Sequence, residues 1–171
     1  MTDLSISLIH ETAADGPAID KLHERAFGPG RFARTAYRLR EGIPAEPSLS
    51  FTAMVGTLLV GSIRLTLIRI GPVDGLLLGP VTVEPAFMNR GIGMALIRKS
   101  LDAARAEGHK LVLLVGDEPY YRRTGFKRVP NGRLEMPGPV DPARLLVLEL
   151  VDGAFEGISG PVLPRLARSA A

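Results

Sequence analysis

The chain has 171 residues, enough to fold as one domain with a sizeable hydrophobic core. It contains no cysteine, which excludes disulfides, thiolate metal ligands and cysteine nucleophiles, and no apolar run of about 20 residues that would predict a membrane span. The formal net charge of +3 suits an anionic ligand, whereas the aromatic content of 5% and the scattered basic residues disfavour a surface on which nucleic acid bases stack.

The N-terminal half of the chain is predicted to begin with a strand at residues 5–10, followed by two helices. The first helix has Asp15 as its cap and ends at Gly28, and its apolar face carries Ile19, Leu22 and Ala26. A second, strongly basic helix is expected at residues 31–41. Three strands, joined by short glycine-containing turns, should then pair antiparallel: 49–55, 58–70 and 76–83.

The C-terminal half is predicted to begin with a helix at residues 91–107, stopped at Gly108. The strand at 111–115 is apolar throughout, which indicates burial on both faces and a parallel crossover from the strand before the helix. A short helical segment at 119–123 and a last strand at 145–150 follow, and the Gly-, Pro- and Ala-rich tail at about 153–171 is expected to be loosely ordered. Without a repeat or a long linker, residues 1–171 are expected to form a single domain with its core at about 5–150.

A glycine-rich turn lies between the strand at 76–83 and the helix at 91–107. Gly91 and Gly93 let a ligand approach the backbone, and the unpaired N–H groups of the first helical turn favour a phosphate or pyrophosphate there. Leu96 stands where a dinucleotide fingerprint has its third glycine, and Met94-Ala95 stands where a Walker loop has its Lys and Ser or Thr. The turn is therefore either an anion site of another kind or a helix start that needs small residues.

Three motifs follow one another around this turn: Val81-Thr82-Val83-Glu84-Pro85, then Arg90-Gly91-Ile92-Gly93, then Tyr121 four residues before Gly125-Phe126. Their order and spacing resemble the GNAT superfamily of acyl-CoA-dependent N-acetyltransferases. Segments 26–29, 34–38 and 113–117 are similar to a branch of small predicted bacterial acetyltransferases. The resemblance covers about residues 5–150. It implies a single α/β domain of GNAT type, in which helices flank a mixed, mostly antiparallel sheet with a splayed parallel central strand pair.

The same resemblance implies acetyl-CoA as cosubstrate, with no metal or tightly held redox cofactor. The pantetheine arm would pair with the backbone near Val81 and Val83, in the gap between the splayed strands. The signature position that usually carries Gln or Arg is Met88 here, so the side-chain contact to CoA from that position is expected to be missing, while the backbone amides still bind. The Arg90 side chain either contacts a phosphate or stays solvated. The candidate backbone donors to the pyrophosphate are Arg90, Gly91, Ile92, Gly93, Met94 and Ala95.

The resemblance also implies direct attack of a primary amine, on a small molecule, peptide or protein, on the acetyl carbonyl in a ternary complex. Tyr121 would lie beside the thioester sulfur. Because the reference pKa of tyrosine is about 10 and that of a thiol about 8.5, we expect Tyr121 mainly to hydrogen-bond the developing thiolate. Glu84 is the first candidate for the general base, followed by Asp117 and Glu118. Alternatively, Glu84 only ends the strand before Pro85, and Asp117 only caps the short helix that follows it. The alternative function is an acyl-CoA-binding sensor of the same fold without turnover.

The expected basic helix is a further candidate for ligand recognition. Arg31, Arg34 and Arg38 share one face of it, where they either recognise an acidic group, contact phosphates or a partner, or stay solvated. Phe32 and Tyr37 either line the acceptor pocket or anchor the helix. The expected partners are acetyl-CoA and an amine acceptor, without nucleic acid or membrane, and the resemblance suggests a homodimer. No signal peptide is recognisable, which together with the lack of cysteine fits a cytoplasmic protein.

Overall fold

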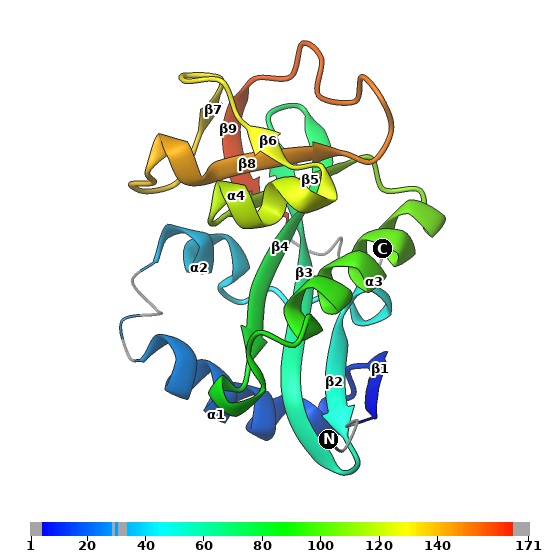
Figure 1. Cartoon of the computed structure of the whole chain (residues 1–171). Helices are drawn as coiled ribbons and strands as arrows, with labels where there is room; N and C mark the ends of the chain where they lie inside the picture. The colour runs from blue at the N-terminus through cyan, green and yellow to red at the C-terminus, as the bar shows by residue number, and fades with distance from the viewer. Residues whose placement is uncertain (1–4, 29, 31–33, 166–171) are drawn as a thin grey trace, which may run out of the picture.

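A computed structural model of the chain describes residues 5–28, 30 and 34–165. Nine strands occur in this part: β1 (Ile6–His10), β2 (Phe51–Val55), β3 (Leu58–Ile70), β4 (Val73–Val83), β5 (Leu111–Val115), β6 (Lys127–Arg128), β7 (Leu134–Glu135), β8 (Leu145–Glu149) and β9 (Gly160–Pro164). Their main path is β1-β2-β3-β4-β5-β8-β6, in which β4 and β5 are parallel and the other neighbours antiparallel. The long β3–β4 hairpin runs through the whole molecule and forms its axis (Figure 1).

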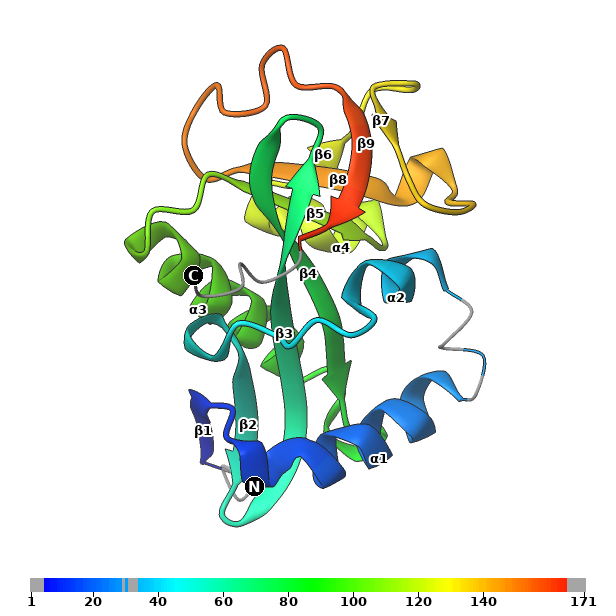
Figure 2. The ribbon, with the colours of Figure 1, turned by 180° about the vertical axis from the view of Figure 1, so that it is seen from behind.

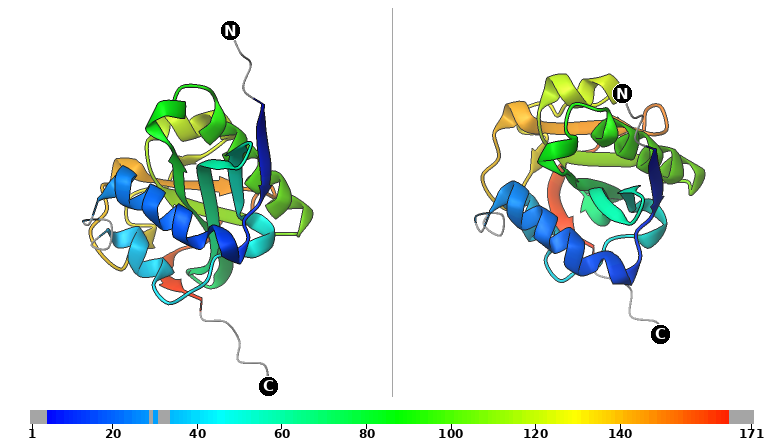
Figure 3. Two further views of the ribbon diagram at one scale, coloured as in Figure 1. Left: turned by 90° about the horizontal axis from the view of Figure 1, so that it is seen from below. Right: turned by 60° about the horizontal axis from the view of Figure 1, so that its bottom comes forward.

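The α-helices cover the two faces of this sheet: α1 (Gly16–Phe27), α2 (Thr35–Arg40), α3 (Ile92–Ala106) and α4 (Glu118–Tyr121). Figures 1 and 2 show α3 and α4 on one face and α1 and α2 on the opposite face. Seen from below in Figure 3, α1 crosses in front of the strands. Short 3₁₀ turns connect several of these elements: η1 (Ala13–Asp15), η3 (Pro47–Leu49), η4 (Pro85–Phe87), η5 (Arg122–Thr124) and η6 (Pro142–Arg144).

The core lies on both sides of the sheet, as the apolar strand at 111–115 predicts. Val112 and Leu114 of β5 belong to the cluster under α3, whereas Leu111 and Leu113 belong to the cluster on the opposite face, which α2 also reaches. On the α3 side the helix lies close to β3 because Gly61 has no side chain. A Cβ at that position would lie 3.2 Å from side-chain atoms of α3.

The sheet opens between β4 and β5. The two strands pair at only two positions, Leu76 with Val112 and Leu77 with Leu113, after which β4 runs on away from β5 (Figure 1). Directly beyond these pairs, β4 carries two residues opposite a single residue of β3, because Ile63 pairs with Val81 and Leu65 with Leu78. Such a bulge bends the strand that carries the extra residue. The predicted splayed central pair is therefore present in the fold.

Most predicted elements agree with the observed ones. The expected boundaries of β3 and β5 are confirmed, and β4 begins at Val73, three residues earlier than expected, because the hairpin turn is tighter. On α1, Ile19 and Leu22 are buried, but the third residue of the expected apolar face, Ala26, is exposed and His23 is buried instead.

The second helix is shorter than the predicted 31–41. It begins at Thr35, whose hydroxyl donates to the Pro139 carbonyl at 2.6 Å and ties the helix start to that segment. Arg34 precedes the helix with extended backbone angles, φ −70° and ψ 140°. The predicted shared face of Arg31, Arg34 and Arg38 is therefore wrong for Arg34 and Arg38, while Arg31 and Phe32 lie outside the described residues.

The expectation of a loosely ordered segment from Gly153 onward is wrong for β9. This strand pairs antiparallel with the end of β3, from Ile68 to Ile70, and parallel with β7. The loop before β9 is held by Arg133, whose guanidinium donates to the carbonyls of Phe155 and Ile158, each at 2.7 Å. Local composition did not indicate this order because the stabilising partners come from distant parts of the chain.

Candidate active site

The glycine-rich turn has the backbone of an anion site. Asn89 and Gly91 both adopt left-handed angles, with φ of 64° and 79°, and α3 starts directly after them. The side chains of Ile92 and Met94 are buried in the core, so the backbone of the first turn faces outward. The first helical hydrogen bond runs from Ala95 N–H to the Gly91 carbonyl at 3.0 Å. The amides before Ala95 therefore have no acceptor within the helix, whereas that of Ala95, a predicted donor, is already used.

Side chains around the turn leave this backbone accessible. Met88 stands at the signature position that usually carries Gln or Arg, and it is exposed, with a relative accessibility of 56%. Its apolar side chain does not supply the polar contact that Gln or Arg would make. The Arg90 guanidinium lies over the Phe87 ring, 5.3 Å from its centroid, and Arg90 is exposed. A Cβ at Gly93 would lie 2.7 Å from the Tyr120 hydroxyl and 3.7 Å from Val83. The start of α3, the end of β4 and α4 therefore meet at Gly93.

A cavity of about 1300 Å³ lies beside this junction. Its walls come from α1, α2, β3, β4, the end of β5, α4 and the segment from Pro139 to Arg144. Of the predicted site residues, Val81 and Tyr121 line it together, while Val83, Glu84 and the turn from Arg90 to Ala95 lie outside its lining. Because its volume exceeds that of most small-molecule pockets, the cavity has room for two ligand parts at once.

Tyr121 enters the cavity from α4 and is fixed by aromatic neighbours. Its ring lies edge-on to Tyr120 and Phe126, with centroid distances of 5.1 and 6.0 Å. Gly116 makes room for the ring, since a Cβ there would lie 2.5 Å from Tyr121 Cε2. Burial raises the pKa of Tyr121 to about 12, with smaller contributions from Tyr120 and Asp117 that outweigh the lowering by Arg144. The phenol is therefore a neutral hydrogen-bond donor at neutral pH.

The three predicted base candidates have different surroundings. Glu84 accepts a hydrogen bond from the Arg25 guanidinium at 2.7 Å and does not line the cavity, so the structure does not bring it together with Tyr121. Glu118 accepts from Arg122 at 2.6 Å and from Arg128, and these hydrogen bonds hold the pKa of its carboxyl below the usual range. Asp117 is exposed at the rim and lines the cavity.

The basic side chains expected on the second helix separate into different positions. Arg34 lines the cavity and lies over the Phe27 ring, 4.9 Å from its centroid. Arg38 donates to the Pro137 carbonyl at 2.9 Å and Tyr37 lines the cavity. Sequence reasoning missed Arg40 as a wall residue.

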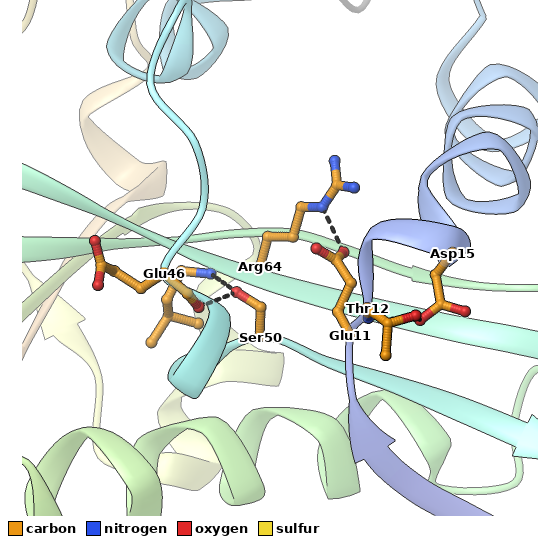
Figure 4. A network of polar contacts seen from close by, with 7 residues as sticks. Glu11, Thr12, Asp15, Glu46, Ser50 and Arg64 are labelled. Carbon is orange, nitrogen blue, oxygen red and sulfur yellow. Dashed lines mark hydrogen bonds and ion pairs between the residues drawn. The ribbon is translucent and has the colours of Figure 1, made fainter.

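Two further wall residues, Glu11 and Arg64, were also missed; they form an ion pair at 2.7 Å (Figure 4). The signal was present for Arg64, because a charged residue in the middle of the apolar strand at 58–70 needs a polar partner inside the fold.

Among solved structures, two resemble this chain over most of its length. One is the crystal structure of the GNAT family N-acetyltransferase YhbS from Escherichia coli in complex with CoA, with a TM-score of 0.81, 24% identity and coverage of 96% of this chain and 92% of that one. The other is a GNAT family acetyltransferase from Brucella melitensis in complex with acetyl-CoA, with a TM-score of 0.62, 29% identity and coverage of 85% and 97%. The opened parallel pair and the glycine-rich helix start thus define an N-acetyltransferase fold.

The sequence comparisons agree with the fold. The chain is 27% identical over 154 residues to an uncharacterized N-acetyltransferase, YhbS, of Escherichia coli K12, covering 89% of this chain and 92% of that protein. It is 33% identical over 118 residues to a second such protein of that strain, YjhQ, covering 67% and 65%. The sequence model of the acetyltransferase (GNAT) family matches residues 17–126. The chain belongs to this family. No helix in the described ranges is both long and apolar enough to cross a bilayer.

Proposed function

We propose that the protein transfers the acetyl group of acetyl-CoA to a primary amine by direct attack in a ternary complex. The observation that carries this proposal is the junction at Gly93, where the turn before α3 meets the end of β4 and helix α4, which lines the cavity with Tyr120 and Tyr121. The complexes of two structural relatives with CoA and acetyl-CoA support acetyl-CoA as the cosubstrate. We place the reaction in the cytoplasm, and a homodimer stays an expectation from the family.

The proposed CoA site combines the turn with the opened strand. The pyrophosphate accepts hydrogen bonds from the amides of Gly91 to Met94, where the dipole of α3 adds partial positive charge. Arg90, beside the turn, contributes charge near a phosphate. The pantetheine arm continues along β4 past Val83 and Val81, whose sheet partner β5 has ended its pairing at Leu77. The acetyl group then enters the cavity beside Tyr121.

In the proposed reaction, the neutral amine forms a bond to the acetyl carbonyl carbon, and the tetrahedral intermediate breaks its C–S bond to release CoA thiolate. Tyr121 stabilises this thiolate by hydrogen bonding. With its pKa of about 12, complete transfer of the phenolic proton to a thiolate of pKa about 8.5 is uphill by about 5 kcal/mol. The thiolate therefore leaves hydrogen-bonded to Tyr121 and takes its proton from water.

The amine must lose a proton around the time of attack. We assign this proton to Asp117, which lines the cavity and lies close enough to Tyr121 to raise the pKa of its phenol. The sequence suggests Glu84 for the same role, and this stays a prediction. We prefer Asp117 because the Glu84 carboxylate accepts a hydrogen bond from Arg25 and lies outside the cavity lining.

The first test is calorimetric titration of the protein with acetyl-CoA, with ATP as the control ligand. Saturable one-site binding of acetyl-CoA, clearly tighter than that of ATP, supports the proposal and justifies measuring amine-dependent thiol release. Binding without thiol release for a broad amine panel supports a CoA-binding sensor instead. If acetyl-CoA at millimolar concentration does not bind, both functions are refuted, and the glycine turn is then only a helix start.

A further inference from the structure

At the end of α2, an arginine that has no carboxylate partner in the described part of the chain lines the cavity. Arg40 lines the cavity, and its guanidinium has no hydrogen-bond or ion-pair partner among residues 5–28, 30 and 34–165. Its Nη1 atom adjoins β4, where a Cβ on Gly79 would lie 3.4 Å from it. Burial, and then repulsion by Arg64, lower the pKa of Arg40 to about 10. The side chain is therefore charged at neutral pH in a place that disfavours charge.

Arg64 reaches the same part of the cavity from β3. It is the single β3 residue opposite the Gly79-Pro80 bulge, because its neighbours Ile63 and Leu65 pair with Val81 and Leu78. Its Nε donates to Glu11 at 2.7 Å. Figure 4 shows both terminal nitrogens of Arg64 directed away from the Glu11 carboxylate. No described residue accepts a hydrogen bond from these two nitrogens, so they are donors available to a ligand.

The charges of the cluster formed by Arg40, Arg64 and Glu11 do not balance. Arg40 and Arg64 carry two positive charges, and Glu11 supplies one negative charge, so one positive charge is left on a partly buried surface. A buried charge without a partner is costly, and a ligand of opposite charge removes that cost. Guanidinium groups bind carboxylates and phosphates through two parallel hydrogen bonds, which fixes the orientation of the ligand as well as its charge.

The cluster is separate from the proposed pyrophosphate site. Val83 lies four residue steps beyond Gly79 on β4, a distance of about 13 Å along an extended strand. Val83 is the end that meets Gly93 and the turn before α3. An anion at Arg40 is therefore not the pyrophosphate bound at the turn, and it lies in the same cavity as Tyr121.

We propose that Arg40 and Arg64 bind an anionic group of the acceptor, so that the acceptor is a primary amine that also carries a carboxylate or a phosphate. This inference rests on the proposed acetyl transfer. Anchoring the anion near the bulge of β4 orients the amine toward the acetyl group, which is the positioning that a reaction between two bound molecules needs.

The test uses acceptors matched in pairs: glycine against glycinamide, and O-phosphoethanolamine against ethanolamine. Thiol release is measured for the wild type, Arg40→Gln and, as a matched control, Arg105→Gln, which removes an exposed arginine of α3 that forms an ion pair with Asp102 of the same helix. We expect the wild type to prefer the charged member of at least one pair. Arg40→Gln should lower kcat/KM for that member about ten- to a hundredfold and for its neutral partner less than twofold. Arg105→Gln should change neither.

A binding experiment decides the question without turnover. Inorganic phosphate and acetate are titrated separately into wild type and Arg40→Gln, both with and without saturating CoA. We expect at least one anion to bind the wild type and to bind Arg40→Gln at least tenfold more weakly, and the anion that binds identifies phosphate or carboxylate as the group recognised. If Arg40→Gln fails to fold in thermal melts, Arg64→Gln and the charge-retaining Arg40→Lys replace it.

The inference is overturned if neither anion distinguishes the wild type from the variant, or if Arg40→Gln slows charged and neutral acceptors equally. Failure of the proposed function looks different, because acetyl-CoA then either does not bind the wild type or binds without thiol release from any amine, charged or neutral. The titrations without CoA still report on Arg40 in that case.

Discussion

Replacing Tyr121 by phenylalanine removes one hydroxyl from the cavity and leaves the ring contacts with Tyr120, Phe126 and Gly116 in place. With a pKa of about 12, the phenol is a hydrogen-bond donor rather than a source of a full proton. A hydrogen bond to a charged group contributes about 1.5–3 kcal/mol. We therefore expect Tyr121→Phe to lower kcat about ten- to a hundredfold and to change the Kd of acetyl-CoA less than twofold.

The assay is initial-rate thiol release between pH 6 and 10, together with calorimetric titration of acetyl-CoA at pH 7. Because the phenol stays protonated in this range, its ionisation should not affect kcat. The wild type should therefore show no change of kcat at basic pH that is absent from Tyr121→Phe. The reasoning is refuted if kcat is unchanged in Tyr121→Phe. It is equally refuted by a wild-type limb between pH 8 and 9 that disappears in the variant, since the phenol would then ionise far below pH 12.

Four further outcomes are expected. Gly91→Ala forces a Cβ into a left-handed conformation at φ 79°, which costs about 1–2 kcal/mol, so calorimetry should show acetyl-CoA binding at least fivefold weaker; unchanged affinity would argue against the turn as the site. Asp117→Asn should lower kcat about a hundredfold and Glu84→Gln less than threefold, and the reverse order would assign the base to Glu84. Phe126→Ala should destabilise the fold by about 3–5 kcal/mol in urea denaturation, and a loss below 1 kcal/mol would contradict its burial at 1% exposure. Above pH 10 the unfolded chain loses the Tyr121 proton while the folded chain keeps it to about pH 12, so the wild type should lose up to about 2.7 kcal/mol relative to Tyr121→Phe between these values; parallel stability curves would contradict the raised pKa.

Elements with a strong local pattern could be predicted from the sequence. The apolar run of β5 required two buried faces, and the helix from Ile92 to Ala106 combined an apolar face with glycines at its start and just beyond its end. β6 and β7 have two residues each, too few for any periodicity to show. The first two residues of β9 are Gly160 and Pro161, a composition that favours a loop. The order of this strand depends on its pairing with β3 and β7.

The candidate site was predictable only in part. The spacing of Tyr121 before Gly125-Phe126 led to a residue that does line the cavity. The role proposed for Arg40 involves the bulge in β4, because Gly79 of the bulge lies beside the Arg40 guanidinium. A register shift between strands leaves no mark in a single sequence. Glu84 stands at the expected end of β4, but its partner, Arg25, comes from α1, and only the folded chain brings them together.

The position of β9 has a consequence for biosynthesis. Its partners in β3 are made early, whereas Val162 and Leu163 leave the ribosome nearly a hundred residues later. The end of the long hairpin is therefore an uncovered sheet edge for most of translation, and such an edge can pair with other chains. Closing it joins segments far apart in the chain, which is a slow kind of contact to form. An affinity tag or fusion partner attached after Pro164 thus adjoins the last strand to dock, and a spacer there lets docking finish first.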